Sequence, residues 1–437
     1  MTRVNSNSAA VATSFLDHGN MAMYAPRPTD LNEPATTASR ADQVSARRLG
    51  GPDQERQRAG VKWIATIPPP LAERDLRIDL FRGLSLWWIY INHIPESYLN
   101  RFTPKNFGFS DAAEILVFLS GLASGIVYGD LLRQSGFAAA SLRMLRRSFE
   151  IYVAQIMTVV LLLAEVAYIA AWQPGMFDHA NLAILLQEPA ETLLQVALLR
   201  YSPVNLDPLL LMVILHFALI LIVPLTIRAW PLALAGSVAL YVLAHQFDWY
   251  IPAYPRGQLY FNPLNWQLLF VIGIWWGANR GNWQLAILNS RALAFLAAGY
   301  LLFSFVITLG WQIHAIEAYV PRWLSRLIYP VDKTNLDILR LLHFAALALL
   351  CWRLLPSNAS ILKARALRPL IRCGEYSLAI YCVSVLLSFA GHALLSLGSN
   401  SLASQTLVTL LGLGLMSALA ILLAAIDRGM FPNLRPL

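Results

Sequence analysis

An arginine and a histidine share one stripe of a hydrophobic segment that begins near residue 80. Arg82 and His93 are eleven positions apart, so on a helix they lie on nearly the same face, about 16 Å apart along the axis. Ionisable side chains are costly inside a membrane span and are candidates for function. An imidazole titrates near about pH 6.5, so it can accept and return a proton. The pattern predicts a general base at His93, beside a helix that opens at Pro95.

Two carboxylates stand at the predicted start of the next helix. Asp111 and Glu114 are three residues apart, and Ser110 before them is suited to the N-cap. A structural role would explain them, because carboxylates are stabilised by the positive end of the helix dipole. Alternatively, one of them orients His93 by holding its second ring nitrogen. We therefore assign His93, Arg82, Asp111 and Glu114 to a candidate catalytic group.

A basic cluster precedes the third hydrophobic segment. Arg143 and Arg146 share a helix face, and Arg147 follows directly. Paired guanidinium groups bind phosphates through charge-assisted hydrogen bonds. The cluster is a candidate site for a ligand with several phosphates, such as a nucleotide or coenzyme A. A basic loop on the cytoplasmic face of a membrane would explain the same residues.

A late segment of the chain mixes aromatic, charged and amide side chains. Aromatic rings at this depth are typical of the interfacial belt. Mixed with polar groups, they are also suited to stacking on a sugar face and to binding its hydroxyls. The candidate substrate-binding residues are Trp323, Lys333, Asn335, Asp337, Arg340 and His343.

The composition determines which elements must position these residues. The chain has 437 residues, of which 57% are hydrophobic and 13% charged, about half the charged share of a soluble domain. The net charge of +8 is distributed between hydrophobic segments, which indicates membrane topology rather than nucleic-acid binding. The three cysteines form no metal-binding pattern, and no metal is expected.

Residues 1–72 have no sustained apolar run, and we interpret them as a disordered cytoplasmic tail. Residues 73–437 then read as one membrane-embedded domain, an all-α bundle of about ten transmembrane helices. The excess of Lys and Arg in alternate loops places both termini in the cytoplasm. The expected spans are 80–98, 111–131, 148–172, 207–228, 231–247, 264–279, 291–311, 336–355, 375–396 and 402–426.

Several of these motifs resemble a known group of enzymes. The Arg82 to His93 spacing, the Arg143-x-x-Arg146 element and Ser120-Gly121 look like acyltransferase family 3. Residues 77–84, 106–114 and 332–344 resemble the OpgC family more closely, and the likeness covers roughly residues 73–437.

The resemblance implies a multi-pass protein of the bacterial inner membrane that moves succinyl groups from cytoplasmic succinyl-CoA to periplasmic glucans. It implies that Arg143, Arg146 and Arg147 serve the CoA donor, that His93 is the base and that Arg82 stabilises charge or guides the thioester. Arg340 and Lys333 are candidates for the free succinyl carboxylate.

Two other functions stay open at this point. The protein could add acetyl groups to another envelope polysaccharide, or it could be a proton-coupled transporter that uses its His and Arg residues as a relay. We see no clear internal repeat of the kind that many transporters have. The expected partners are acyl-CoA, a glucan and membrane lipid, with a homodimer possible and no nucleic acid.

Overall fold

The computed structural model describes residues 75–95, 97–173, 175–279, 282–313, 321–398 and 400–429. Within these ranges the chain is helical and has no named β-strand, as predicted. The tail of residues 1–72 lies outside the described residues. The longer helices are α3 Leu76–His93, α4 Ala112–Ala170, α8 Asp207–Arg228, α9 Trp230–Gln246, α10 Pro263–Ala278, α12 Arg291–Gln312, α15 Ile338–Leu354, α17 Ser377–Leu397 and α18 Leu402–Asp427.

Shorter helices fill the connections between them. These are η1 Tyr98–Phe102, η2 Pro104–Asn106, α5 Met176–His179, α6 Ala183–Gln187, α7 Pro189–Ala197, α11 Asn282–Asn289, α14 Arg322–Ile328, η3 Ser360–Lys363, η4 Arg365–Leu367 and α16 Arg368–Glu375. The connection between α4 and α8 holds three of them, α5, α6 and α7.

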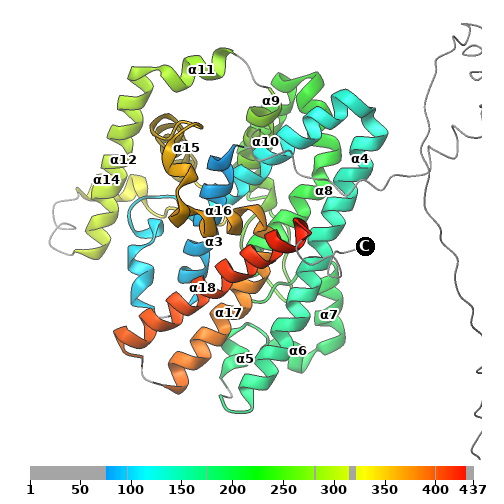
Figure 1. Ribbon diagram of the computed structural model, residues 1–437, viewed down its shortest axis with the longest axis vertical. Coiled ribbons are helices and arrows are strands. Elements are labelled where there is room, and N and C mark those ends of the chain that lie inside the picture. The colour runs from blue at the N-terminus through cyan, green and yellow to red at the C-terminus, as the bar shows by residue number, and fades with distance from the viewer. Residues whose placement is uncertain are drawn as a thin grey trace, which may run out of the picture. The chain divides into compact units, whose positions relative to one another are not determined.

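Among the described residues, five helices are long and apolar enough to cross a membrane by length and composition. They are Ala112–Ala170, Asp207–Arg228, Arg291–Gly310, Ser377–Leu397 and Leu402–Asp427. Helix α4 covers two of the expected spans, 111–131 and 148–172. Its helical backbone is interrupted at Gly136 (φ 79°) between them, and the chain turns within α4 in Figure 1. The chain is therefore a helical membrane protein, while the count of about ten spans and the cytoplasmic termini remain predictions.

Helix α3, which carries Arg82 and His93, is packed among α4, α16 and α17 (Figure 1). Its approach to α16 depends on glycines. A Cβ atom at Gly83 would overlap the carbonyl oxygen of Leu370, and one at Gly374 would overlap that of Asp79. Small residues let helix backbones approach closely inside a bilayer. This contact fixes the half of α3 that bears Arg82.

Helices α4 and α10 cross through a matching set of glycines. A Cβ atom at Gly121 or Gly125 would overlap carbonyl oxygens of α10, and one at Gly273 or Gly277 would overlap those of α4. Both pairs have the small-xxx-small spacing that is typical of close membrane helices. The crossing fixes the direction of α4 immediately after its N-terminus, where the predicted carboxylates lie.

The start of α4 differs from the prediction in one respect. Its N-cap is Asp111, not Ser110. The Asp111 carboxylate accepts from the Ala113 amide at 2.8 Å, and Glu114 accepts from the Asp111 amide at 2.9 Å. This is a capping box, which satisfies amides that the helix itself cannot. Ser110 is not available for capping, because its hydroxyl contacts His343 at 2.7 Å.

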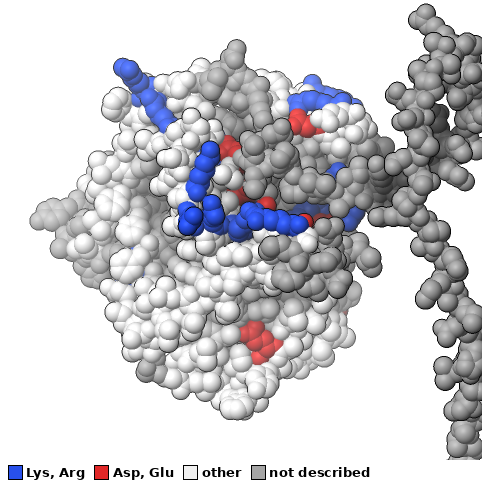
Figure 2. All heavy atoms as spheres, in the orientation of Figure 1, with Lys and Arg blue, Asp and Glu red and all other residues white. Residues whose placement is uncertain are grey.

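Basic side chains gather on one face of the molecule, in the region of α16 and the end of α18 (Figures 1 and 2). Arg353, Lys363, Arg365 and Arg368, which come before or at the start of α16, are exposed. Most of the rest of this face is uncharged in Figure 2. The pattern is that of a basic loop beside lipid-facing helices.

Candidate active site

His93 is the last residue of α3 and lines a polar cavity of about 160 Å³. Its Nδ1 atom is buried and has no hydrogen-bond partner among the described residues. A buried polar nitrogen without a partner is costly and calls for an explanation, such as a catalytic role. The other lining residues come from α3, the loop before α8, α5 and α17: Asn92, Pro95, His179, Val204, Asn205, Ser388, Phe389 and His392.

Arg82 lines a second cavity, of about 190 Å³. Its guanidinium donates to the Leu119 carbonyl at 3.2 Å and lies 4.0 Å from the Asp79 carboxylate. Arg147 lines the same cavity, as do Ser120 and His216, whose side chains are 3.4 Å apart. This cavity therefore combines two cations with hydroxyl and imidazole groups.

The two cavities follow one another along the same pair of helices. Helix α3 provides Arg82 to one and His93 to the other, and α17 provides Tyr381 to one and Ser388 to the other. The cavities share no lining residue. Between them the Tyr381 hydroxyl donates to the Asn205 carbonyl at 2.6 Å. Asn205 is held in the left-handed region (φ 70°) and lines the cavity of His93.

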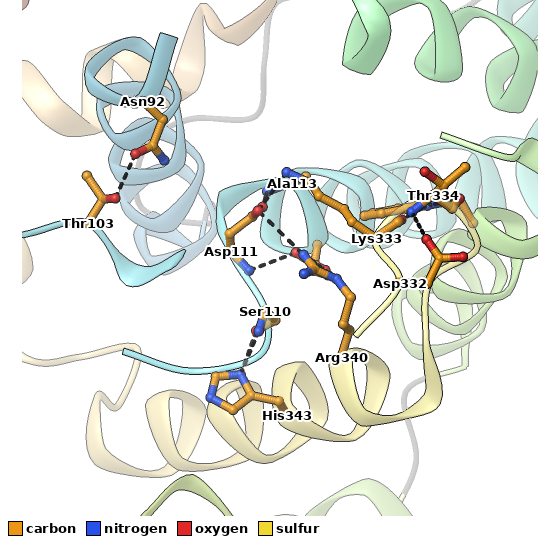
Figure 3. Close-up of polar contacts among 12 residues, drawn as sticks. Asn92, Thr103, Ser110, Asp111, Ala113, Asp332, Lys333, Thr334, Arg340 and His343 are labelled. Carbon is orange, nitrogen blue, oxygen red and sulfur yellow. Dashed lines mark hydrogen bonds and ion pairs between the residues drawn. The ribbon is translucent and has the colours of Figure 1, made fainter. Parts of the chain in front are cut away.

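Two carboxylates and two cations form a partly buried cluster at the start of α4, and Figure 3 shows Asp111, Lys333 and Arg340 of it. Lys333 Nζ lies 2.7 Å from Asp111 Oδ2. Arg340 reaches Glu114 Oε1 through Nε at 2.7 Å and through Nη2 at 2.6 Å, and its Nη2 is 3.4 Å from Asp111 Oδ2. Glu114 is fully buried. We call Asp111, Glu114, Lys333 and Arg340 the charged cluster.

The charges of this cluster neutralise one another. Burial alone would lower the pKa of Lys333, but the carboxylates of Asp111 and Glu114 outweigh burial and hold that pKa above its usual value. The ammonium therefore stays charged. Buried ion pairs of this kind persist because removing either partner leaves an uncompensated charge.

The expected hydrogen bond from Asp111 or Glu114 to His93 is not present among the described residues. Both carboxylates are engaged by Lys333, Arg340 and the capping amides. Nevertheless, Asp111 and Lys333 are among the charged groups whose fields act on the His93 ring. Asp111 thus acts on His93 through its charge without holding its ring nitrogen.

His343 fixes the loop before α4 to α15. Its Nδ1 accepts from the Ser110 amide at 3.3 Å and contacts the Ser110 hydroxyl at 2.7 Å. A Cβ atom at Gly108 would overlap the other side of the ring. The ring is therefore enclosed, and this geometry favours a structural role over contact with a substrate.

The predicted phosphate-binding arginines do not act as one group in this structure. Arg146 and Arg147 each lie 3.2 Å from the Glu150 carboxylate on the surface of α4. Arg147 alone of the three lines the cavity of Arg82, and Arg143 is half-buried outside the lining. Of the three arginines, only Arg147 thus lies in a cavity with another predicted site residue, Arg82.

The remaining candidates lie around the loop that bears Lys333. Asn335 donates to Asp332 at 2.7 Å and accepts from Asn262 at 2.9 Å. Asp337 is the N-cap of α15, bound to the Leu339 amide at 2.7 Å. Trp323 is 68% exposed on α14. Asn335 and Asp337 therefore shape the loop, whereas Trp323 is available to a ligand.

The sequence interpretation missed Asn205 and Ser388, which line the cavity of His93. A single Asn in a loop and a single Ser in a hydrophobic helix have no spacing signal. Only the packing of α17 against α3 and against the loop before α8 brings them together. The described residues contain no group of three or more His, Cys, Asp or Glu side chains that could hold a metal ion.

The fold and the two cavities define a class of protein: a helical membrane protein in which one helix provides a buried histidine to one cavity and an arginine to another. Comparison with known families is more specific. The family described as OpgC protein matches residues 74–428, and the chain belongs to this family. Membership points to an acyltransferase. No curated protein and no solved structure matches the chain.

Proposed function

We propose that this protein is an O-succinyltransferase of the bacterial inner membrane, which moves succinyl groups from cytoplasmic succinyl-CoA to hydroxyls of periplasmic glucans. The observation that most supports the proposal is the Nδ1 of His93, which is buried in a polar cavity and has no partner in the part of the chain that the structure describes. A group that must take up and release a proton needs one ring nitrogen free for the reacting hydroxyl. Membership of the OpgC family supports the choice of reaction.

In the proposed reaction, His93 removes the proton of a glucan hydroxyl as its oxygen attacks the thioester carbonyl carbon. The carbon–sulfur bond then breaks, and the imidazolium returns the proton to the leaving thiolate. The products are an O-succinyl glucan and free CoA. Asp111 would act on His93 through its charge, and Glu114 would act indirectly by holding the start of α4, rather than by a direct hydrogen bond.

The donor would approach from the cavity that Arg82 and Arg147 line. Arg147, with Arg143 and Arg146 nearby, would bind the CoA phosphates, and Arg82 would guide the thioester. The acyl arm would then follow α3 for about 16 Å to His93. Tyr381 and Asn205 stand between the two cavities, so we propose that they move apart as the arm passes. Trp323 is the candidate for stacking on the glucan.

The test compares glucans from cells that carry the wild-type protein, His93→Ala or no gene. Wild-type glucans are expected to show mass increments of one succinyl group, and both other samples are expected to lack them. His392→Ala serves as a matched control, because it removes a second imidazole from the lining of the same cavity. Acetyl increments in the wild type, or succinyl increments that persist in His93→Ala, would contradict the proposal.

A further inference from the structure

A succinyl group differs from an acetyl group mainly in its second carboxylate, which must be desolvated to enter a cavity in the membrane. A buried carboxylate is tolerated only with a cation beside it. Lys333 and Arg340 are the obvious cations of this region, but each already has a carboxylate partner. The charged cluster has two acids and two bases, so its formal charge is −2 + 2 = 0.

Lys105 is a cation in the same region that has no such partner. It is half-buried in η2, and among the described residues it forms no hydrogen bond or ion pair with a carboxylate. Burial and the positive charge of Lys333 lower the pKa of Lys105, and the negative charge of Asp111 partly offsets this effect. A desolvated cation repelled by a neighbouring cation is stabilised when an anion binds beside it.

The loop that carries Lys105 is fixed next to His93. Thr103, two residues before Lys105, donates its hydroxyl to Asn92 at 2.7 Å (Figure 3), and Asn92 directly precedes His93. Lys105 is also one of the charged groups whose fields act on the His93 ring. An extended four-carbon chain spans about 4 Å from its first to its last carbon, and a lysine side chain reaches about 6 Å. An acyl chain with its thioester carbon at His93 would therefore carry its second carboxylate about 4 Å further on, within the length that a lysine side chain can span.

We propose that Lys105 is the specificity-determining residue that binds the free carboxylate of the acyl group and thereby selects a dicarboxylic acyl donor over a neutral one. The inference rests on the proposed acyl transfer at His93. Two neighbouring cations, Arg101 near Lys105 in the chain and Arg340 of the charged cluster, do not compete for this role. Arg101 is exposed and lies over the Tyr98 ring at 5.2 Å, and Arg340 is held by Glu114.

The test uses purified full-length protein with glucan acceptor and two donors, succinyl-CoA and butyryl-CoA, which have acyl chains of equal length but different charge. Lys105→Met removes the charge and keeps the length of the side chain. Its kcat/KM with succinyl-CoA is expected to fall about 10- to 150-fold, the range for a lost charge-assisted hydrogen bond. Its kcat/KM with butyryl-CoA is expected to stay within about threefold, because that chain makes no such bond.

Two further variants separate selectivity from folding. Lys105→Arg is expected to keep the preference for succinyl-CoA, and Arg101→Met is expected to leave both donors unchanged. An equal loss with both donors in Lys105→Met, or no loss with either, would overturn the role of Lys105. If the wild type transfers neither acyl group, both the proposed reaction and the role of Lys105 are wrong. If Lys105→Met transfers acyl groups with the selectivity of the wild type, only the role of Lys105 is wrong.

Discussion

Neutralising Glu114 tests how the charged cluster is stabilised. Glu114→Gln keeps the size of the side chain and an oxygen for the Asp111 amide, which Glu114 accepts at 2.9 Å. It removes the charge that Arg340 contacts through both Nε and Nη2. Arg340 is then left with Asp111 at 3.4 Å, a carboxylate that it shares with Lys333. The cluster changes from neutral to a net charge of +1 in a buried position.

The expected cost follows from that uncompensated charge. Removing one partner of a buried ion pair destabilises a protein by about 3–5 kcal/mol. Because Asp111 still partly compensates Arg340, we expect the lower end, about 3 kcal/mol. This equals roughly a 150-fold change in the ratio of unfolded to folded protein. Glu114→Gln with Arg340→Met removes both charges and is expected to recover at least half of the loss.

Equilibrium unfolding in mixed micelles of dodecyl maltoside and SDS measures these free energies. Glu150→Gln is the control, because Glu150 also pairs with two arginines but does so on the exposed surface. Its cost is expected to stay below about 1 kcal/mol. Equal losses in Glu114→Gln and in the double variant would refute the reasoning, since the net charge would then not be the cause. A loss in Glu114→Gln no larger than in the control would refute it as well.

Other variants test the remaining contacts. Gly374→Val would drive a side chain into a carbonyl of α3, so we expect no monodisperse protein in size-exclusion chromatography. Gly236→Ala, with open space around it, is expected to elute like the wild type, and equal behaviour of the two would contradict the packing argument. Tyr381→Phe removes the hydroxyl that donates to Asn205 and is expected to raise acyl-CoA hydrolysis without acceptor; unchanged hydrolysis would argue against a barrier there. Trp323→Ala, on an exposed helix face, is expected to raise KM for glucan severalfold at unchanged stability, and an unchanged KM would remove it from the acceptor site.

Local spacing was sufficient to predict the elements that carry the chemistry. The eleven-residue interval between Arg82 and His93 correctly placed both on one helix, because helix geometry determines such intervals. Arg340 and His343, both candidates for substrate binding, are three residues apart on α15. Both side chains face the start of α4, where they contact Glu114 and Ser110.

Pairing across the chain could not be predicted from spacing. Asp111 and Lys333 are 222 positions apart, and nothing local indicates that they meet. The sequence therefore allowed Asp111 to face His93 and Lys333 to face a substrate carboxylate, although the two in fact neutralise each other. Ser110 and Asp111 are both good N-caps, and the choice between them depended on His343, a residue of another helix.

The ionisable groups of the site lie at helix ends rather than in the middle of spans. His93 ends α3, Asp111 and Glu114 begin α4, and Arg340 lies in the first turn of α15. At helix ends, loops and capping amides can satisfy charges that a span cannot, so the cost of burying them is reduced there. Arg82, in contrast, lies in the first half of α3 and lines a different cavity. In the proposed reaction, a donor bound near Arg82 reaches His93 only by extending its acyl arm along α3. We therefore expect the separation between the two cavities, as well as the base, to determine which donors this protein can use.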